Sequence, residues 1–164
     1  MTVQAPPGFA EVTFDGDRGS VRFTRRLGTS LDDAWQVVSD PERIARWFAP
    51  VTVTDKEWIT YWDDGREYAK GEILTCEPHR LIEVSWFASD DAEPLVETLL
   101  RVTLSADDEG VLLVLEHDNV LTADLIQYGP GWHTYLDRLP DGDPRLDFSS
   151  RFEELTVQYG ELLR

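Results

Sequence analysis

Two extended strands joined by a turn are predicted by residues 66–87, REYAKGEILTCEPHRLIEVSWF. The first run spans Arg66–Cys76 and the second spans Leu81–Phe87, with Glu77-Pro78-His79 between them. In the second run, apolar and polar side chains alternate: Ile82, Val84 and Trp86 against Glu83 and Ser85. Such alternation is typical of a strand with one face in the core and the other in water.

The strand pattern continues on both sides of this segment. Trp58–Trp62 precedes it across Asp63-Asp64-Gly65, which is a hairpin signal. Leu95–Leu104 and Val111–His117 follow it, after a loop at residues 90–94, and they flank the turn Asp107–Gly110. With a brief pairing at Val51–Val53, the chain predicts about five or six antiparallel strands in sequential order.

Two short helices are predicted before this series, directly after a strand at Ser20–Leu27. Ser30 and Asp33 resemble a capping box, and the apolar residues that follow have helical spacing. Asp40-Pro41 begins the second helix, because Asp is a good N-cap and Pro is tolerated at the first helical position. A further short strand is predicted at Glu11–Phe14, after a loose leader over residues 1–10.

The end of the chain is predicted to be helical. Gly129-Pro130-Gly131 is expected to break the chain, with a helix starting at Trp132. The segment Pro140–Pro144 interrupts that helix, and an amphipathic helix follows within residues 146–164. Strands followed by helices indicate one α+β domain over residues 1–164, with a curved antiparallel sheet around a long C-terminal helix. A cavity can remain between such a sheet and the helix.

Charge and cysteine content limit the function classes. The 164 residues carry 15 Lys plus Arg against 32 Asp plus Glu, a formal net charge of −17. This charge repels phosphate backbones and anionic headgroups, so we expect neither nucleic-acid nor membrane binding. Cys76 is the single cysteine, which excludes an internal disulfide and suits a reducing compartment. With no signal-peptide pattern and no apolar run near 18 residues, we expect a cytoplasmic protein.

The order and spacing of several short motifs resemble one protein family over about Val21–Leu139. The matching pieces are Ala34-Trp35, Asp40-Pro41-Glu42, Arg46-Trp47-Phe48, Asp64-Gly65, Gly71-Glu72-Ile73, Glu77-Pro78, Leu81, Trp86, Tyr128, Gly131-Trp132, Leu136 and Leu139. Together they resemble the AHSA1-like (activator of Hsp90 ATPase homologue) group of the START/Bet v 1-like SRPBCC superfamily. The resemblance implies a helix-grip fold with an internal cavity for an apolar or amphipathic small molecule. Two departures are Lys56-Glu57, where the family often has Gly-Gly, and the split at Pro140–Pro144 with the divergent tail Leu146–Arg164.

Nine residues are predicted to bind the ligand: Trp47, Phe48, Trp86, Leu100, Val102, His117, Tyr128, Trp132 and Tyr135. For the aromatic residues the alternative interpretation is ordinary core packing. His117, in phase with Leu113 and Leu115, could transfer protons, bind a ligand carbonyl, or sit half-exposed at a strand end. His133 is expected to face solvent and Cys76 to be a buried, inert thiol.

The leading functional hypothesis is non-catalytic binding of a small molecule, since such sites are concave and mostly apolar. A co-chaperone for an Hsp90-type ATPase is an alternative that the family name suggests. A third is a cyclase- or hydrolase-type enzyme, with His117 and Tyr128 as the polar groups. We expect no metal and no cofactor, because the three His and one Cys lack zinc-site spacing. The sequence is compatible with a monomer or a homodimer.

Overall fold

A computed structural model describes residues 1–89, 91, 96–140, 142–143 and 145–164. Most of the predicted loop at 90–94, the start of the strand expected from Leu95, and Asp141 and Pro144 of the predicted break lie outside these residues. Within the described residues, nine strands form one antiparallel sheet in the order β1-β2-β3-β9-β8-β7-β6-β5-β4. Their bounds are β1 Thr2–Val3, β2 Glu11–Asp15, β3 Arg18–Leu27, β4 Val51–Val53, β5 Glu57–Tyr61, β6 Glu67–Glu77, β7 Leu81–Ala88, β8 Thr98–Asp107 and β9 Gly110–Leu121.

The last six strands form a sequential meander, as the alternation of apolar residues predicts. After β9 the sheet continues with β3, so the connection from β3 to β4 must pass from one part of the sheet to its far edge. That connection contains the two short helices, α1 Leu31–Ser39 and α2 Pro41–Trp47. The predicted α+β fold with a curved antiparallel sheet is therefore confirmed.

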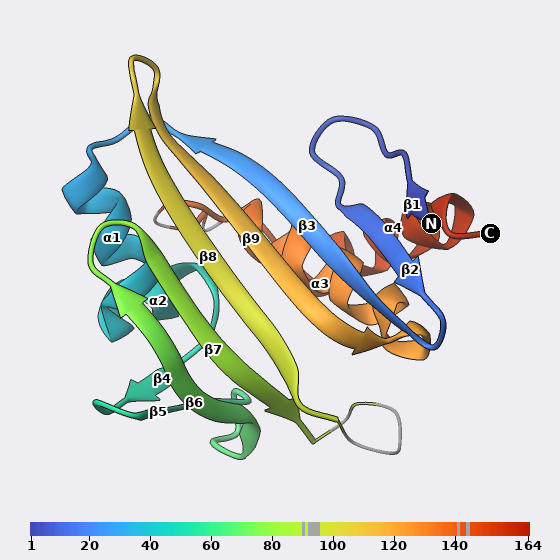
Figure 1. Ribbon diagram of the computed structural model, residues 1–164, viewed down its shortest axis with the longest axis horizontal. Helices are drawn as coiled ribbons and strands as arrows, with labels where there is room; N and C mark the ends of the chain where they lie inside the picture. The colour runs from blue at the N-terminus through green and yellow to red at the C-terminus, as the bar shows by residue number, and fades with distance from the viewer. Residues whose placement is uncertain (90, 92–95, 141, 144) are drawn as a thin grey trace.

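The helices cover one face of the sheet, behind the strands in Figure 1. A 3-10 turn at Thr122–Asp124 leads into α3 Leu125–Leu136, which runs behind β3 and β9 (Figure 1). The last helix, α4 Phe148–Leu162, packs against α3. No helix in the described part of the chain has the length and apolar character needed to cross a membrane.

The caps of α1 and α2 form where the sequence predicts them. The Ser30 hydroxyl accepts a hydrogen bond from the Asp33 amide at 3.1 Å, which begins α1. The Asp40 carboxylate accepts from the Glu42 amide at 3.2 Å, and Pro41 occupies the first position of α2. These caps fix where α2 starts, and therefore place Trp47 at its end and Phe48 at its C-cap.

The predicted break at residues 129–131 is wrong. The helix α3 starts at Leu125 and runs through Pro130, whose ring removes one backbone hydrogen bond. Burial of Leu125, Tyr128 and Trp132 stabilises the helix despite that loss. Packing explains why residue 129 is glycine, because a Cβ there would lie 3.1 Å from the ring of Tyr159 on α4. The C-terminal part thus contains two helices, as the sequence predicts, but the first of them starts earlier than expected.

The N-terminal segment is anchored instead of forming the expected loose leader. Thr2 and Val3 pair with Thr13 and Val12 of β2. Ala10 is buried, and its amide donates a hydrogen bond of 2.9 Å to the Tyr159 hydroxyl on α4. Composition alone suggested a loop because Pro6-Pro7-Gly8 interrupts any periodic pattern, and the pairing depends on contacts far along the chain.

Gly71 marks a close approach of three strands. Trp58 on β5 is the cross-strand partner of Gly71 on β6. The indole N–H of Trp58 passes beyond β6 and donates a 3.0 Å hydrogen bond to the Ser85 carbonyl on β7. A Cβ at Gly71 would lie 1.8 Å from that carbonyl oxygen, so only glycine fits this position.

We expect Gly71→Ala to lower the free energy of unfolding by about 3 kcal/mol, because the added methyl group forces the two strands apart. Gly160→Ala in α4 is the matched control, since a Cβ there meets nothing within 4 Å. The control should raise stability by roughly 0.5–1 kcal/mol through helix propensity. Urea denaturation of both variants measures the difference, and equal stabilities would contradict the close approach.

Candidate functional site

A first cavity of about 180 Å³ lies between the sheet and the helices α1, α2 and α3. Its walls are almost entirely apolar. The helices and the C-cap of α2 contribute Val38, Ile44, Trp47, Phe48 and Trp132; the strands contribute Val51, Val53, Trp58, Ile73, Ile82, Val84, Trp86, Leu100, Val102 and Leu115. Ser39 and Cys76 complete the lining. It lies between the sheet and the helices, where the family resemblance implies a cavity.

A bulge in β6 aims two of these side chains inward. Ile73 pairs with Val84 and Thr75 pairs with Glu83, so Leu74 is an extra residue. Without the bulge, Ile73 and Cys76 would face opposite sides of the sheet, because side chains alternate along a strand. With it, both reach the cavity while Leu74 is exposed.

Cys76 is exposed, and the prediction of a buried thiol is wrong. It lies near the end of β6, where it lines the first cavity next to solvent. The alternation in the sequence could not indicate this, because the bulge shifts the phase only in the folded sheet. The thiol therefore marks an accessible point on the cavity wall.

A second cavity of about 290 Å³ lies between α3, the start of α4 and the β5–β6 hairpin. Of the eleven described residues that line it, nine are aromatic: Phe48, Trp62, Tyr68, Trp86, Tyr128, Trp132, Tyr135, Phe148 and Phe152. Gln127 and Gly131 are the other two. The sequence predicted Phe148 and Phe152 only as the apolar face of a helix, and it gave no signal that this face borders a cavity.

Three aromatic residues form the wall that the two cavities share. Phe48, Trp86 and Trp132 line both. The rings of Phe48 and Trp132 stack at a centroid distance of 5.3 Å and an interplanar angle of 16°. Trp86 meets Trp132 edge-on at 5.5 Å. Stacked and edge-to-face pairs are favourable arrangements for aromatic rings, so the wall is a packed structure.

The structure divides the predicted ligand-binding residues between the two cavities. Trp47, Leu100 and Val102 line only the first, Tyr128 and Tyr135 line only the second, and His117 lines neither. Residues that the prediction missed include Trp58 and Ile73 in the first cavity and Trp62 and Tyr68 in the second. Trp62 and Tyr68 flank the hairpin turn, where nothing in the local pattern distinguishes a cavity wall from a surface.

His117 is fully buried on β9 and both ring nitrogens are hydrogen-bonded. The indole N–H of Trp132 donates to Nδ1 at 3.0 Å. Nε2 lies 2.7 Å from the hydroxyl of Thr98, which donates to the backbone carbonyl of Trp86 at 3.1 Å. Because an indole can only donate, Nδ1 must accept, and the proton of the neutral ring is on Nε2. His117 therefore joins α3 to three strands, and the geometry leaves neither nitrogen for proton transfer.

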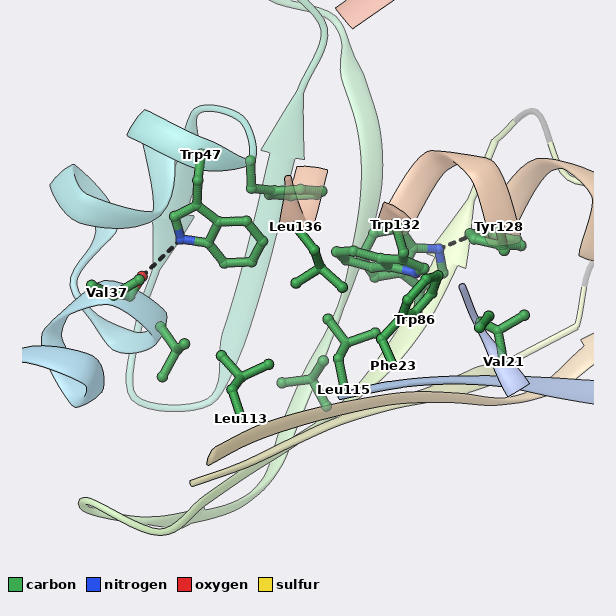
Figure 2. Close-up of a cluster of buried hydrophobic side chains, with 14 of the residues drawn as sticks. Val21, Phe23, Val37, Trp47, Trp86, Leu113, Leu115, Tyr128, Trp132 and Leu136 are labelled. Carbon is green, nitrogen blue, oxygen red and sulfur yellow. Dashed lines mark hydrogen bonds between the residues drawn. The ribbon is translucent and has the colours of Figure 1, made fainter. Parts of the chain in front are cut away.

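A second hydrogen bond joins the sheet to α3. The indole N–H of Trp86 donates to the Tyr128 hydroxyl at 2.9 Å, and that hydroxyl donates to the Asp91 carboxylate at 2.6 Å. Figure 2 shows Trp86, Tyr128 and Trp132 together at one end of the core, with Trp47 bonded to Val37 at the other. Burial raises the pKa of Tyr128, so its hydroxyl keeps the proton that it donates.

His133 is buried, and the prediction that it faces solvent is wrong. Its Nδ1 lies 2.9 Å from the Tyr159 hydroxyl, and its Nε2 lies 3.7 Å from Asp137. The sequence placed it outward because α4, which covers this side of α3, was not expected to pack there. Burial lowers the pKa of His133 to about 4, against the opposing effect of Asp137.

We expect Trp132→Phe to destabilise the fold by about 1–3 kcal/mol, because Nδ1 of His117 is left buried without a donor. Trp62→Phe is the matched control, since Trp62 is 39% exposed and its substitution should change stability by less than about 0.5 kcal/mol. Urea unfolding of the two variants provides the comparison. A Trp132 variant as stable as the control would show that the hydrogen bond contributes nothing.

The two buried histidines make stability depend on pH. Burial lowers the pKa of His117 to about 3, while both rings titrate near 6.5 in the unfolded chain. As the pH falls from 6.5 towards 4, the unfolded state binds protons that the folded state does not, so stability falls. Each ring contributes up to about 1.4 kcal/mol per pH unit.

His117→Gln should reduce this slope by up to that amount between pH 6.5 and pH 5, because glutamine does not titrate. Denaturation at a series of pH values measures the slope. The prediction fails if the variant folds and retains the wild-type dependence on pH.

The family model described as "Activator of Hsp90 ATPase homolog 1-like protein" matches residues 28–141. No curated protein matches the chain. The crystal structure of CalU16 from Micromonospora echinospora is similar, with 25% identity, a TM-score of 0.69, and coverage of 90% of this chain and 89% of that one.

Two further solved structures share the fold. The protein encoded by gene BPP1335 from Bordetella parapertussis has 22% identity, a TM-score of 0.69, and coverage of 98% of this chain and 95% of that one. DynU16, a protein of the dynemicin biosynthetic locus, has 21% identity and a TM-score of 0.61. The match covers 89% of this chain and 49% of DynU16. These likenesses confirm the helix-grip architecture.

Proposed function

We propose a function from one premise: the chain belongs to the family of activator of Hsp90 ATPase homolog 1-like proteins, within the SRPBCC superfamily. The function is non-catalytic binding of an apolar or amphipathic small molecule in the first cavity. The observation that carries the proposal is the lining of that cavity, which is apolar on all sides except for Ser39 and Cys76. Small molecules are usually held in concave, mostly apolar sites of this kind.

The volume of the first cavity limits the size of the ligand that it can hold. An apolar cavity near 150 Å³ in another protein stays dry and holds benzene, so a cavity of about 180 Å³ suits one ring or a short alkyl group. The exposed thiol of Cys76 marks a side where a polar end of the ligand can reach solvent. These features support a ligand with an apolar part inside and a polar part at the mouth.

The alternatives from the sequence gain less support. An enzyme would need a polar group that can reach the ligand, but His117 lines neither cavity and bonds through both nitrogens. Tyr128 lines only the second cavity. Regulation of an Hsp90-type ATPase stays a prediction from the family description.

We expect n-butylbenzene to bind the wild-type protein, as seen by saturation-transfer NMR. Its occupancy should slow the alkylation of Cys76 by iodoacetamide, because this single thiol lines the cavity. Leu100→Trp should weaken binding at least tenfold, since the larger side chain fills the cavity. Val102→Phe tests the same idea with a smaller increase in volume.

The matched control is Leu99→Trp, one position along β8, where the side chain points to the opposite face of the sheet. This control should bind n-butylbenzene as the wild type does. An absence of binding to the wild type would refute the proposal. So would equal binding by folded Leu100 and Leu99 variants.

A further inference from the structure

We propose that the second cavity is a separate binding site for a planar aromatic cation. The proposal does not depend on occupancy of the first cavity. Two of its lining residues, Phe148 and Phe152, come from α4, which lies beyond the residues that the family model matches. One wall of the site is thus contributed by a part of this chain that lies outside the family match, while its other described lining residues lie within that match.

Aromatic side chains from several elements form the walls of the cavity. On one side, Trp62 and Tyr68 of the β5–β6 hairpin are in contact at a centroid distance of 4.3 Å. On another side, Phe148 and Phe152 of α4 are stacked at 5.8 Å with an interplanar angle of 14°. The shared wall of Phe48, Trp86 and Trp132 closes the cavity towards the first. A flat ring system presents a π-face to such walls and buries a large apolar area against them.

The charge of the protein favours a ligand that carries a positive charge. None of the described residues that line this cavity is acidic or basic, so a bound cation meets aromatic faces and no opposing positive charge. Arg151, which precedes Phe152, is paired with Asp137 and Glu154. Cation–π attraction strengthens when the cation is desolvated, and the formal net charge of −17 attracts cations and repels anions.

The polar edge of the cavity also suits a positively charged donor. The Tyr128 hydroxyl accepts a hydrogen bond from Trp86 and donates its proton to Asp91. The hydroxyl proton of Tyr128 is therefore already used in a hydrogen bond, and one lone pair of its oxygen remains to accept an N–H group of the ligand. The adjacent carboxylate of Asp91 adds negative potential at the same edge. A protonated heteroaromatic amine combines the flat ring, the charge and the donor.

Three probes of different chemistry test the proposal. Proflavine is a planar tricyclic cation, anthracene-9-carboxylate is an anion of similar ring size, and tetraethylammonium is a cation without a ring. Titrations by fluorescence and calorimetry in 0.3 M NaCl suppress diffuse adsorption to the acidic surface. We expect proflavine to bind one to one, with an affinity at least tenfold higher than that of either other probe. Equal affinity for the anion or for tetraethylammonium would overturn the proposal.

Variants locate the site. Phe152→Ala in α4 and Trp62→Ala in the β5–β6 hairpin should each weaken proflavine binding at least fivefold. Phe87→Ala is the matched control for Trp62→Ala, because Phe87 is 38% exposed, Trp62 is 39% exposed, and Phe87 lines neither cavity. Leu100→Trp should leave proflavine binding unchanged.

Unchanged binding by folded Phe152 and Trp62 variants would place proflavine elsewhere and refute the proposal. Loss of proflavine binding in Leu100→Trp would assign it to the first cavity, with the same consequence. Binding of n-butylbenzene, measured on the same variants, separates this result from failure of the first proposal. Thermal unfolding of each variant confirms that it folds.

Discussion

The hydrogen bond from Trp132 to His117 fixes α3 on the sheet, and much of the molecule depends on it. It begins a closed path that leaves α3 at Trp132, crosses three neighbouring strands through His117, Thr98 and Trp86, and returns to α3 at Tyr128. Trp132 and Tyr128 are one helical turn apart. The path therefore fixes both the rotation of α3 about its axis and its position along that axis. A buried polar network of this kind is favourable only when every member is bonded.

The same path determines where empty space remains. Trp86 and Trp132 are held by their indole N–H groups, so their rings cannot turn to fill the volume beside them. Phe48, placed at the C-cap of α2, stacks on Trp132 and completes the wall. One cavity is therefore left on each side, and the two differ in chemistry because different elements line them. Strands supply aliphatic side chains to the first, and the hairpin and α4 supply rings to the second.

Packing of α4 on α3 links the second cavity to the N-terminal segment. The Tyr159 hydroxyl accepts a hydrogen bond from the Ala10 amide and is hydrogen-bonded to His133 on α3. The ring of Tyr159 lies against Gly129. Phe148 and Phe152, about three and two turns earlier on α4, reach the cavity because this contact sets the position of the helix. Residues at both ends of the chain thus support the wall of one site.

The local sequence determined the elements whose signals are short-range. Alternation of apolar residues predicted the meander, and Ser30 and Asp40 predicted the starts of α1 and α2, because period and caps depend on neighbours in the chain. The same signals indicated the three residues of the shared wall, since Phe48, Trp86 and Trp132 occupy apolar faces.

Tertiary structure alone decided the features that depend on distant contacts. Pro130 is tolerated inside α3 because α4 and the sheet bury that helix, and His133 is buried for the same reason. The β6 bulge brings Cys76 to the first cavity, and it exists only in the pairing with β7. The division of one expected pocket into two follows from the Trp132–His117–Trp86 path, whose members are remote in sequence. Sequence periodicity says which face of an element is apolar, but three-dimensional packing decides which part of that face is filled and which is left open.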